Sequence, residues 1–252
     1  MINEYLLTFD TDWASDSIIS EVGKYLIKNK IKSTWFITND SPEIRKMIDL
    51  PDFFEVGIHP NFYEGSTQGK TPQEVMKNLL KIVPHAKSIR THDLIQSTSL
   101  LKMIREEFNI LYDVSLLLPE TPNIIPHEIF YSKNNGLLRF PFFWEDDIEM
   151  YKDKPVFSLI NNKYHKDGIK IFNFHPIHIT LNSYSMKNYN ICKLKKDINK
   201  YSLSELKDYI NKSKNGTGIF FKQLIQMIRK KPYFPSITIS ELAVKWMNSD
   251  KS

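Results

Sequence analysis

The first half of the chain alternates short apolar runs with helical patterns of apolar residues. The apolar runs predict buried strands at residues 4–9, 33–38, 53–58, 87–91 and 109–114. Serine or threonine N-caps and first-turn prolines mark the starts of helices between several of them. Strands that alternate with helices pair in parallel through helical crossovers. The predicted fold class is therefore α/β, and we expect its ligand chemistry at the carboxyl ends of the strands.

The pattern weakens after Pro119. Residues 119–136 are rich in proline and asparagine and are expected to form a loop, and the polar segment 177–215 is expected to be an insertion or lid. No repeat or linker divides the chain, so we expect a single catalytic domain over residues 1–252. The remaining expected elements are strands at 137–143 and 169–174, helices near 203–213 and at 216–230, and a strand-to-helix unit at 237–248.

Composition and charge narrow the class of protein. Hydrophobic residues make up 41% of the 252 positions and charged residues 25%, which is typical of a globular protein. The single cysteine, Cys192, excludes an internal disulfide and a zinc site made of cysteines alone. The net charge of +5 comes from lysines spread along the chain, without a dense basic stripe, so we expect no nucleic-acid partner.

The chain shows no targeting or spanning segment. Its first residues lack a basic region, and the apolar stretch 5–9 is interrupted by Asp10, so we expect no signal peptide. No apolar run approaches the roughly 18 residues of a transmembrane helix. These features predict a cytoplasmic protein without a transmembrane segment, and they do not indicate an oligomeric state.

Ionisable residues stand where the predicted strands end. Parallel strands bring their carboxyl ends to one face, so these side chains should converge there. A single polar residue at a strand end is often only a cap or a solvated rim residue, but several on one face favour a reactive site. The residues are Asp10, Asp12, His59, Arg90, His92, Asp113, Arg139 and His175.

Asp10 and Asp12 are alternate residues near a strand end, so their carboxylates can share a face. Like charges at that distance need a cation or a shared proton, and a metal held by one would leave the other as a base. The alternative is that Asp12 only caps the next helix. His59 and His92 are suitable nitrogen ligands for zinc or a similar metal. His175 ends an apolar run and is either a general acid or a buried structural histidine.

In this order, the segments resemble the motifs of the polysaccharide deacetylase (NodB-homology) family of metal-dependent carbohydrate deacetylases. The resemblance spans about residues 4–180. It is carried by Phe9-Asp10-Thr11-Asp12, Ser33-Thr-Trp-Phe-Ile-Thr, Glu55-Val-Gly-Ile-His59-Pro60, Arg90-Thr91-His92 and Phe174-His175-Pro176.

The resemblance implies a deformed (β/α)7 barrel that holds one divalent metal ion, with zinc expected, and hydrolyses an acyl amide or ester on a sugar. It implies that Asp12 and His59 bind the metal and that Asp10 is the catalytic base. Arg90 falls where the family has an active-site arginine, which we expect to orient Asp10. His175 would be the general acid that protonates the leaving amine.

The chain also departs from the family pattern. The family has a second histidine four residues after the first, but position 63 is tyrosine, so the third ligand is expected from His92 or from Asn61. Thr11 separates the two aspartates, which are contiguous in the family. The His-Pro-Asn-Phe and Arg-x-His elements resemble a variant subgroup found among surface-polysaccharide and O-antigen gene products.

The expected function is therefore metal-dependent hydrolysis of the N-acyl group, acetyl or formyl, of an amino sugar in surface-polysaccharide biosynthesis. The substrate would be a free sugar, a nucleotide-sugar or a lipid-linked glycan. The alternative is a catalytically silent family member that binds a glycan or organises a biosynthetic complex. The acidic run Glu145–Asp147 after Trp144 is interpreted as a helix start, with a place at the rim of the cleft as the alternative.

Overall fold

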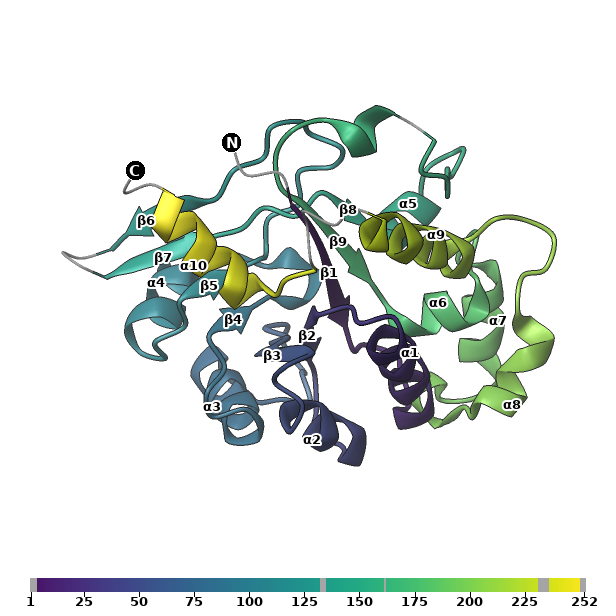
Figure 1. The fold of residues 1–252 in the computed structure, drawn as a ribbon. Coiled ribbons are helices and arrows are strands. Elements are labelled where there is room, and N and C mark those ends of the chain that lie inside the picture. The colour runs from purple at the N-terminus through teal and green to yellow at the C-terminus, as the bar shows by residue number, and fades with distance from the viewer. Residues whose placement is uncertain (1–3, 132–134, 161, 231–235, 250–252) are drawn as a thin grey trace.

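A computed structural model describes residues 4–131, 135–160, 162–230 and 236–249. Its core is a curled nine-stranded sheet with the order β6-β7-β5-β4-β3-β2-β1-β9-β8 (Figure 1). All neighbouring strands pair in parallel except β6 and β7, which form an antiparallel pair at one edge. The strands are β1 Tyr5–Asp10, β2 Ser33–Ile37, β3 Phe54–Ile58, β4 Ser88–Ile89, β5 Tyr112–Asp113, β6 His127–Phe130, β7 Gly136–Arg139, β8 Trp144–Glu145 and β9 Lys170–Phe174.

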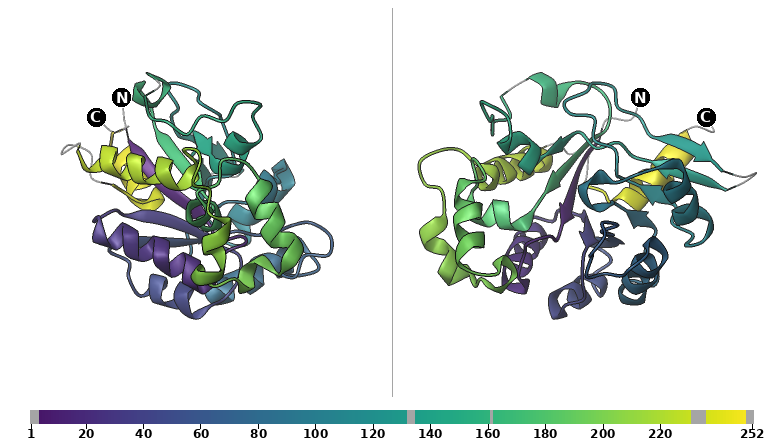
Figure 2. Two further views of the ribbon diagram at one scale, coloured as in Figure 1. Left: turned by 90° about the vertical axis from the view of Figure 1, so that its right-hand side faces the viewer. Right: turned by 180° about the vertical axis from the view of Figure 1, so that it is seen from behind.

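Helices follow most of the parallel strands and cover the outer face of the sheet (Figures 1 and 2). The side chains of Ser41, Thr71 and Ser97 accept hydrogen bonds from first-turn amides, so the prediction that serine or threonine caps several of these helices is confirmed. The α-helices are α1 Asp16–Lys28, α2 Pro42–Ile48, α3 Pro72–Ile82, α4 Thr98–Glu106, α5 Asp146–Met150, α6 Pro176–Leu181, α7 Lys187–Lys195, α8 Leu203–Leu206, α9 Thr217–Arg229 and α10 Ile239–Ser249. The short 3-10 helices are η1 His92–Leu94, η2 Asn162–His165, η3 Ile198–Lys200 and η4 Lys207–Tyr209.

The two faces of the curled sheet bury different partners. On the outer face Leu7 and Phe9 of β1 belong to a core that includes residues of α1, α3 and α9. On the inner face Leu6 packs in a separate core with Leu242 and Ala243 of α10. Because side chains alternate along a strand, Thr8 and Asp10 share the inner face with Leu6. The inner face therefore changes from apolar to polar toward the carboxyl end of β1.

The α/β prediction is confirmed, and the curled sheet is that of a deformed barrel. The predicted strands over the first half correspond to β1–β5, although β4 and β5 are shorter than expected. Close contact between β3 and β4 depends on Gly57, since a Cβ atom there would lie 2.5 Å from Ser88 Oγ. This contact brings the residues that follow the two strands, His59 and Arg90, onto one face.

The second half differs from the prediction in three places. The expected loop 119–136 contains β6, whose mostly exposed residues pair with β7 at the sheet edge. The segment 177–215 holds α6 and α7 besides the expected helix near 203–213, which is present as α8 and η4. The unit at 237–248 is α10 without a preceding strand in its described part, and residues 231–235 lie outside the described ranges.

Segment 177–215 packs on the rest of the molecule. Ile177, Leu181, Tyr189 and Leu206 form a small core with Ile18 of α1. The Ser15 hydroxyl donates a 2.7 Å hydrogen bond to the Tyr201 carbonyl oxygen instead of capping α1. Within the part of the chain that the structure describes, no helix is both long and apolar enough to cross a bilayer.

Candidate active site

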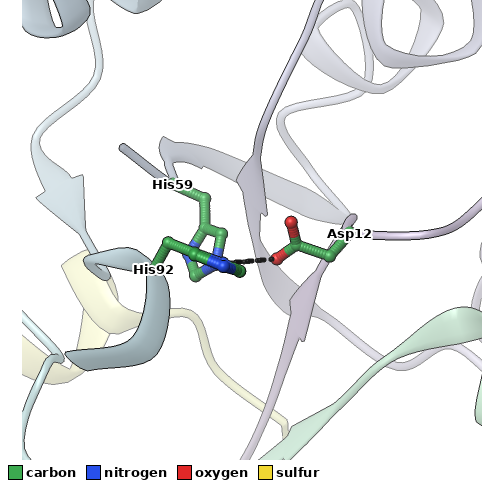
Figure 3. A group of neighbouring side chains, drawn as sticks. All are labelled: Asp12, His59 and His92. Carbon is green, nitrogen blue, oxygen red and sulfur yellow. Dashed lines mark hydrogen bonds and ion pairs between the residues drawn. The ribbon is translucent and has the colours of Figure 1, made fainter. Parts of the chain in front are cut away.

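Three predicted metal ligands meet at the carboxyl ends of β1, β3 and β4. Asp12 follows β1, His59 directly follows β3, and His92 begins the short helix η1 after β4. Figure 3 shows the two imidazole rings and the Asp12 carboxylate pointing toward one another. Asp12 Oδ2 lies 2.8 Å from His59 Nε2 and 3.5 Å from His92 Nδ1, and the two ring nitrogens are 3.3 Å apart.

Hydrogen bonding on the far side of His59 fixes which ring nitrogen faces this cluster. His59 Nδ1 lies 2.7 Å from the Arg90 carbonyl oxygen, which can only accept a hydrogen bond. In neutral His59, Nδ1 therefore carries the proton, and Nε2 turns its lone pair toward Asp12 and His92. Asp12 Oδ2 is buried without a hydrogen-bond partner among the described residues, although it lies only 2.8 Å from His59 Nε2.

These donors fit a divalent metal ion. Ligand atoms bound tetrahedrally at about 2.0–2.1 Å from zinc stand roughly 3.3 Å apart, which is close to the separations seen here. Two imidazole nitrogens and one carboxylate oxygen suit zinc or a similar ion and leave a coordination position open. Burial alone would raise the pKa of Asp12, but the two imidazoles hold it below its usual range, so the carboxylate is ionised.

The two alternatives for the third ligand differ in the structure. His92 reaches the cluster, and its ring stands edge-on to that of His59 with centroids 5.4 Å apart. Asn61 Oδ1 instead accepts a hydrogen bond from the Tyr63 amide. The Tyr63 hydroxyl donates to the Asp93 carboxylate, and its ring stands edge-on to that of His92 with centroids 6.5 Å apart, so this tyrosine braces the turn that carries His92.

Asp10 lies next to this cluster but is held by different groups. Arg90 Nη1 donates to Asp10 Oδ1 at 3.1 Å, and the Asn173 amide donates to Oδ2 at 2.7 Å. The Asn173 oxygen accepts from Arg90 at 2.5 Å, which fixes the direction of the amide because Arg90 can only donate. Asp10 is thus positioned through both of its oxygens.

The arginine behind Asp10 is itself rigidly packed. Its guanidinium lies between the rings of Phe36 and Phe142, at 4.6 Å from each centroid, and also donates to Thr8 Oγ1 at 2.9 Å. Burial raises the pKa of Asp10, but Arg90 and the neighbouring imidazoles outweigh it, so the pKa is lowered. Asp10 is therefore an ionised carboxylate in a nearly closed site.

His175 directly follows β9, and one of its ring nitrogens lies within 4.8 Å of a carboxylate oxygen of Asp10. Its Nδ1 lies 2.8 Å from Asp146 Oδ1, and its backbone amide donates to Asp146 Oδ2 at 2.9 Å. Burial lowers the pKa of His175, but Asp146 outweighs this and raises it well above the ordinary value. The imidazole is therefore held in its protonated form, with Nε2 on the side away from Asp146.

A family model described as WbmS-like polysaccharide deacetylase matches residues 7–193. The chain belongs to this family. The match includes every residue of the site described above, and it agrees with the resemblance seen in the sequence motifs. None of the curated proteins that were searched matches the chain significantly.

Solved structures extend the comparison. The chain is similar to a Bordetella bronchiseptica protein assigned as a polysaccharide deacetylase involved in O-antigen biosynthesis, with 28% identity over 88% of this chain and 90% of that one and a TM-score of 0.76. A family 4 acetyl xylan esterase from Clostridium thermocellum, solved with a cobalt ion, is more distant. It is 14% identical over 94% of this chain and 89% of that one, with a TM-score of 0.48. A CE4 family pseudoenzyme from Bacillus anthracis is 10% identical over 95% of this chain and 65% of that one, with a TM-score of 0.47. Because the TM-scores of the last two structures are this low, their similarity carries no information about the function of the chain.

Trp13 of this family member forms a wall beside the general-acid candidate. Its indole stacks on His175, with centroids 5.1 Å apart and planes inclined by 23°. Its backbone is left-handed, with φ of 59°, which is unusual for a bulky residue. Trp13 also contacts Tyr189 of α7, with ring centroids 5.4 Å apart, so segment 177–215 supports this wall.

Sequence reasoning did not assign three polar residues of the site: it interpreted Glu145 and Asp146 as a helix start, with the rim of the cleft as the alternative, and it did not single out Asn173. Asp146 does begin α5, as the acidic run indicated, yet its carboxylate is buried against His175. Glu145 and Asn173 are in register on β8 and β9, and both turn to the inner face. A polar residue inside the fully buried strand β9 was the signal that could have identified Asn173.

Proposed function

We propose that this protein removes the N-acyl group, acetyl or formyl, from an amino sugar in surface-polysaccharide biosynthesis, with the aid of one divalent metal ion. The observation that supports this most is the convergence of Asp12 Oδ2, His59 Nε2 and His92 Nδ1 within 3.5 Å, beside an ionised Asp10 and a protonated His175. A bound divalent ion, with zinc expected, would polarise the acyl oxygen and acidify a water molecule.

The reaction adds water to the amide and yields a carboxylic acid and a free amine. Asp10 accepts a proton from the attacking water, because its carboxylate is ionised and held in place by Arg90 and Asn173. His175 donates a proton to the leaving nitrogen, since an amide anion is too basic to depart unprotonated. Asp146 keeps that imidazole charged and oriented before the reaction.

The whole chain is proposed to act as one catalytic domain in the cytoplasm, on a free sugar, a nucleotide-sugar or a lipid-linked glycan. Segment 177–215 contacts Trp13 through Tyr189 and is proposed as a lid over the site. The competing function is a silent, glycan-binding family member. The presence of Tyr63 at the position of the family's second histidine favours that alternative, whereas the intact pair of Asp10 and His175 favours catalysis.

One experiment separates the two functions. The metal content of the purified protein is measured together with amine release from a panel of N-acetylated and N-formylated amino sugars. We expect about one equivalent of divalent metal, amine release from at least one sugar, loss of release after chelation and recovery with zinc. A protein that binds no metal and releases no amine from any sugar would be the silent member.

A further inference from the structure

Glu145 is a buried carboxyl at the reaction centre for which the proposed mechanism has no use. It lies on β8 in register with Asn173 of β9, and its Oε1 accepts a 2.8 Å hydrogen bond from the Asn173 amide. The same amide nitrogen donates to Asp10 Oδ2 at 2.7 Å. A single carboxamide group therefore stands between two carboxyl groups.

The second oxygen of Glu145 is not held by the protein. Among the described residues, only Asn173 donates a hydrogen bond to this carboxyl. A carboxyl oxygen of Glu145, a carboxylate oxygen of Asp10 and a ring nitrogen of His175 all lie within 4.8 Å of one another. A group this close to both the base and the acid lies within reach of the substrate atoms on which they would act.

Within the described chain, Glu145 forms no ion pair with a basic side chain. Asp10 of β1 and Asp147 of α5 repel its ionised form, and Asp146 is engaged with His175. Arg90 and His175 attract it, but Arg90 bonds Asp10 and Asn173 instead.

Burial raises the pKa of Glu145 to about 8, with further repulsion from Asp147 and Asp10. At neutral pH the side chain is thus a carboxylic acid. Since Oε1 accepts from Asn173, the proton belongs on Oε2 and is available as a hydrogen-bond donor.

A second metal ion at this cluster would need Asp10, Glu145 and His175 as ligands. The structure argues against it, because Asp10 is already bonded by Arg90 and Asn173, and the latter also bonds Glu145. The cluster of Asp12, His59 and His92 differs in this respect, because Asp12 Oδ2 accepts no hydrogen bond within the described chain. Glu145 therefore fits a hydrogen-bonding role better than a ligand role.

We propose that Glu145 is a substrate-binding residue that enters the reaction centre as a neutral carboxylic acid and donates a hydrogen bond to a sugar oxygen next to the acylated nitrogen. This inference rests on the proposed function for the identity of its partner. The state of its proton does not depend on that function, so the two parts can be tested separately.

The proton is tested without substrate by carbon-13 NMR of the zinc-loaded protein labelled at the glutamate side-chain carboxyl carbon. We expect one carboxyl signal that titrates near pH 8 and is absent from Glu145→Gln. Glu149→Gln is the matched control, because Glu149 is also buried but accepts a 2.6 Å hydrogen bond from Lys152, and its removal should leave that signal in place. Titration of Glu145 near pH 4 to 5 would overturn the neutral-acid assignment.

The substrate contact is tested by the dissociation constants of N-acetylglucosamine, N-acetylgalactosamine and their N-formyl counterparts, measured from pH 6.5 to 9.5. Binding of the best of these sugars by the wild type should weaken above about pH 8, approaching tenfold per pH unit. Glu145→Gln, a neutral donor, should bind within about threefold of the wild type and lose this pH dependence, whereas Glu145→Leu should bind roughly tenfold more weakly.

Three outcomes would overturn the contact: Glu145→Leu binds like the wild type, Glu145→Gln keeps the pH dependence, or the wild type binds none of the sugars. The wild type could hydrolyse a sugar whose binding does not depend on Glu145. That result would refute this inference alone and leave the proposed function intact. Melting temperatures and zinc content of both variants identify a folding defect. If Glu145→Leu is misfolded, the Glu145→Gln pH profile alone decides.

Discussion

The two sides of the site differ in how their charged side chains are stabilised. On the side of Asp12, His59 and His92, three ligand atoms crowd together, and Asp12 Oδ2 has no hydrogen bond within the described chain. On the side of Asp10 and His175, both oxygens of Asp10 and Nδ1 of His175 are matched by hydrogen-bond partners in the protein. The first arrangement needs a cation or a shared proton between its members, whereas the protein itself supplies the partners of the second. The comparison separates metal ligands from acid–base groups although both sets are built from carboxylates and imidazoles.

The largest effect should come from removing a ligand. We expect Asp12→Ala to weaken zinc binding by more than about 100-fold, since it deletes one of three ligands, and to abolish turnover at ordinary zinc concentrations. Zinc affinity is measured by competition with a chromophoric chelator. Asp16→Ala, on the same segment, is the control and should bind zinc normally. Equal affinities of Asp12→Ala and the wild type would place the metal elsewhere.

The matched side should respond in the opposite way. Asp10→Asn should lower turnover by roughly 100-fold or more while zinc stays bound, because the amide cannot accept the proton of water. The new NH2 group must face Arg90 or the Asn173 amide, both of them donors, so we also expect a loss of about 1–2 kcal/mol in stability. Turnover, zinc content and thermal unfolding are measured on the same preparation. Zinc loss as complete as in Asp12→Ala would refute the division between the two sides.

His175→Ala should distinguish substrates by their leaving groups. Hydrolysis of an N-acyl sugar should fall by roughly 100-fold, whereas an activated ester, whose leaving group needs no proton, should lose much less. Zinc content should not change. Equal losses on the amide and the ester would assign His175 a structural role.

A smaller effect, visible mainly in the pH profile, is expected from Asp146→Asn. Asp146 raises the pKa of His175, and the acid form exists only below that pKa. Removing the carboxylate lowers the pKa, so the alkaline limb of the turnover profile should move to lower pH, with about tenfold less turnover at pH 8. An unchanged limb would show that another group supplies the proton.

The smallest effect should follow Tyr63→Phe. The side chain is half exposed and bonds Asp93 rather than a ligand, and such exposed bonds contribute little. Zinc affinity should change by less than about threefold. A larger loss would mean that the brace on the turn after His92 is needed for the third ligand to reach the metal.

The sequence predicted the parts of the molecule that depend on local pattern. Apolar runs and caps placed β1, β2, β3 and their helices, and the strand ends pointed to Asp10, Asp12, His59, Arg90, His92 and His175. The edge strand β6 was missed because its side chains are mostly exposed and its stability comes from pairing with β7. Helix α7 was missed because its lysines and asparagines form no apolar stripe.

The partners of the site residues could not be predicted, because they depend on register between distant segments. Asn173 meets Asp10 only since β9 pairs with β1 across 163 positions of sequence. Glu145 and Asp146 looked like a helix start, and the sequence carries no sign that β8 would turn them to the inside. The metal ligands were easier to identify because the motif around each one is local.

The left-handed backbone at Trp13 has a consequence for protein engineering. An L-residue in that conformation costs about 1–2 kcal/mol, and glycine would remove the cost. Glycine would also delete the packing of the indole on His175, Tyr189 and the small core beneath it. Truncation of a packed tryptophan typically costs about 3–5 kcal/mol, which is more than the strain that glycine relieves. A library selected only for heat resistance should therefore keep an aromatic residue at position 13, and the contacts that select it would also keep a ring over His175.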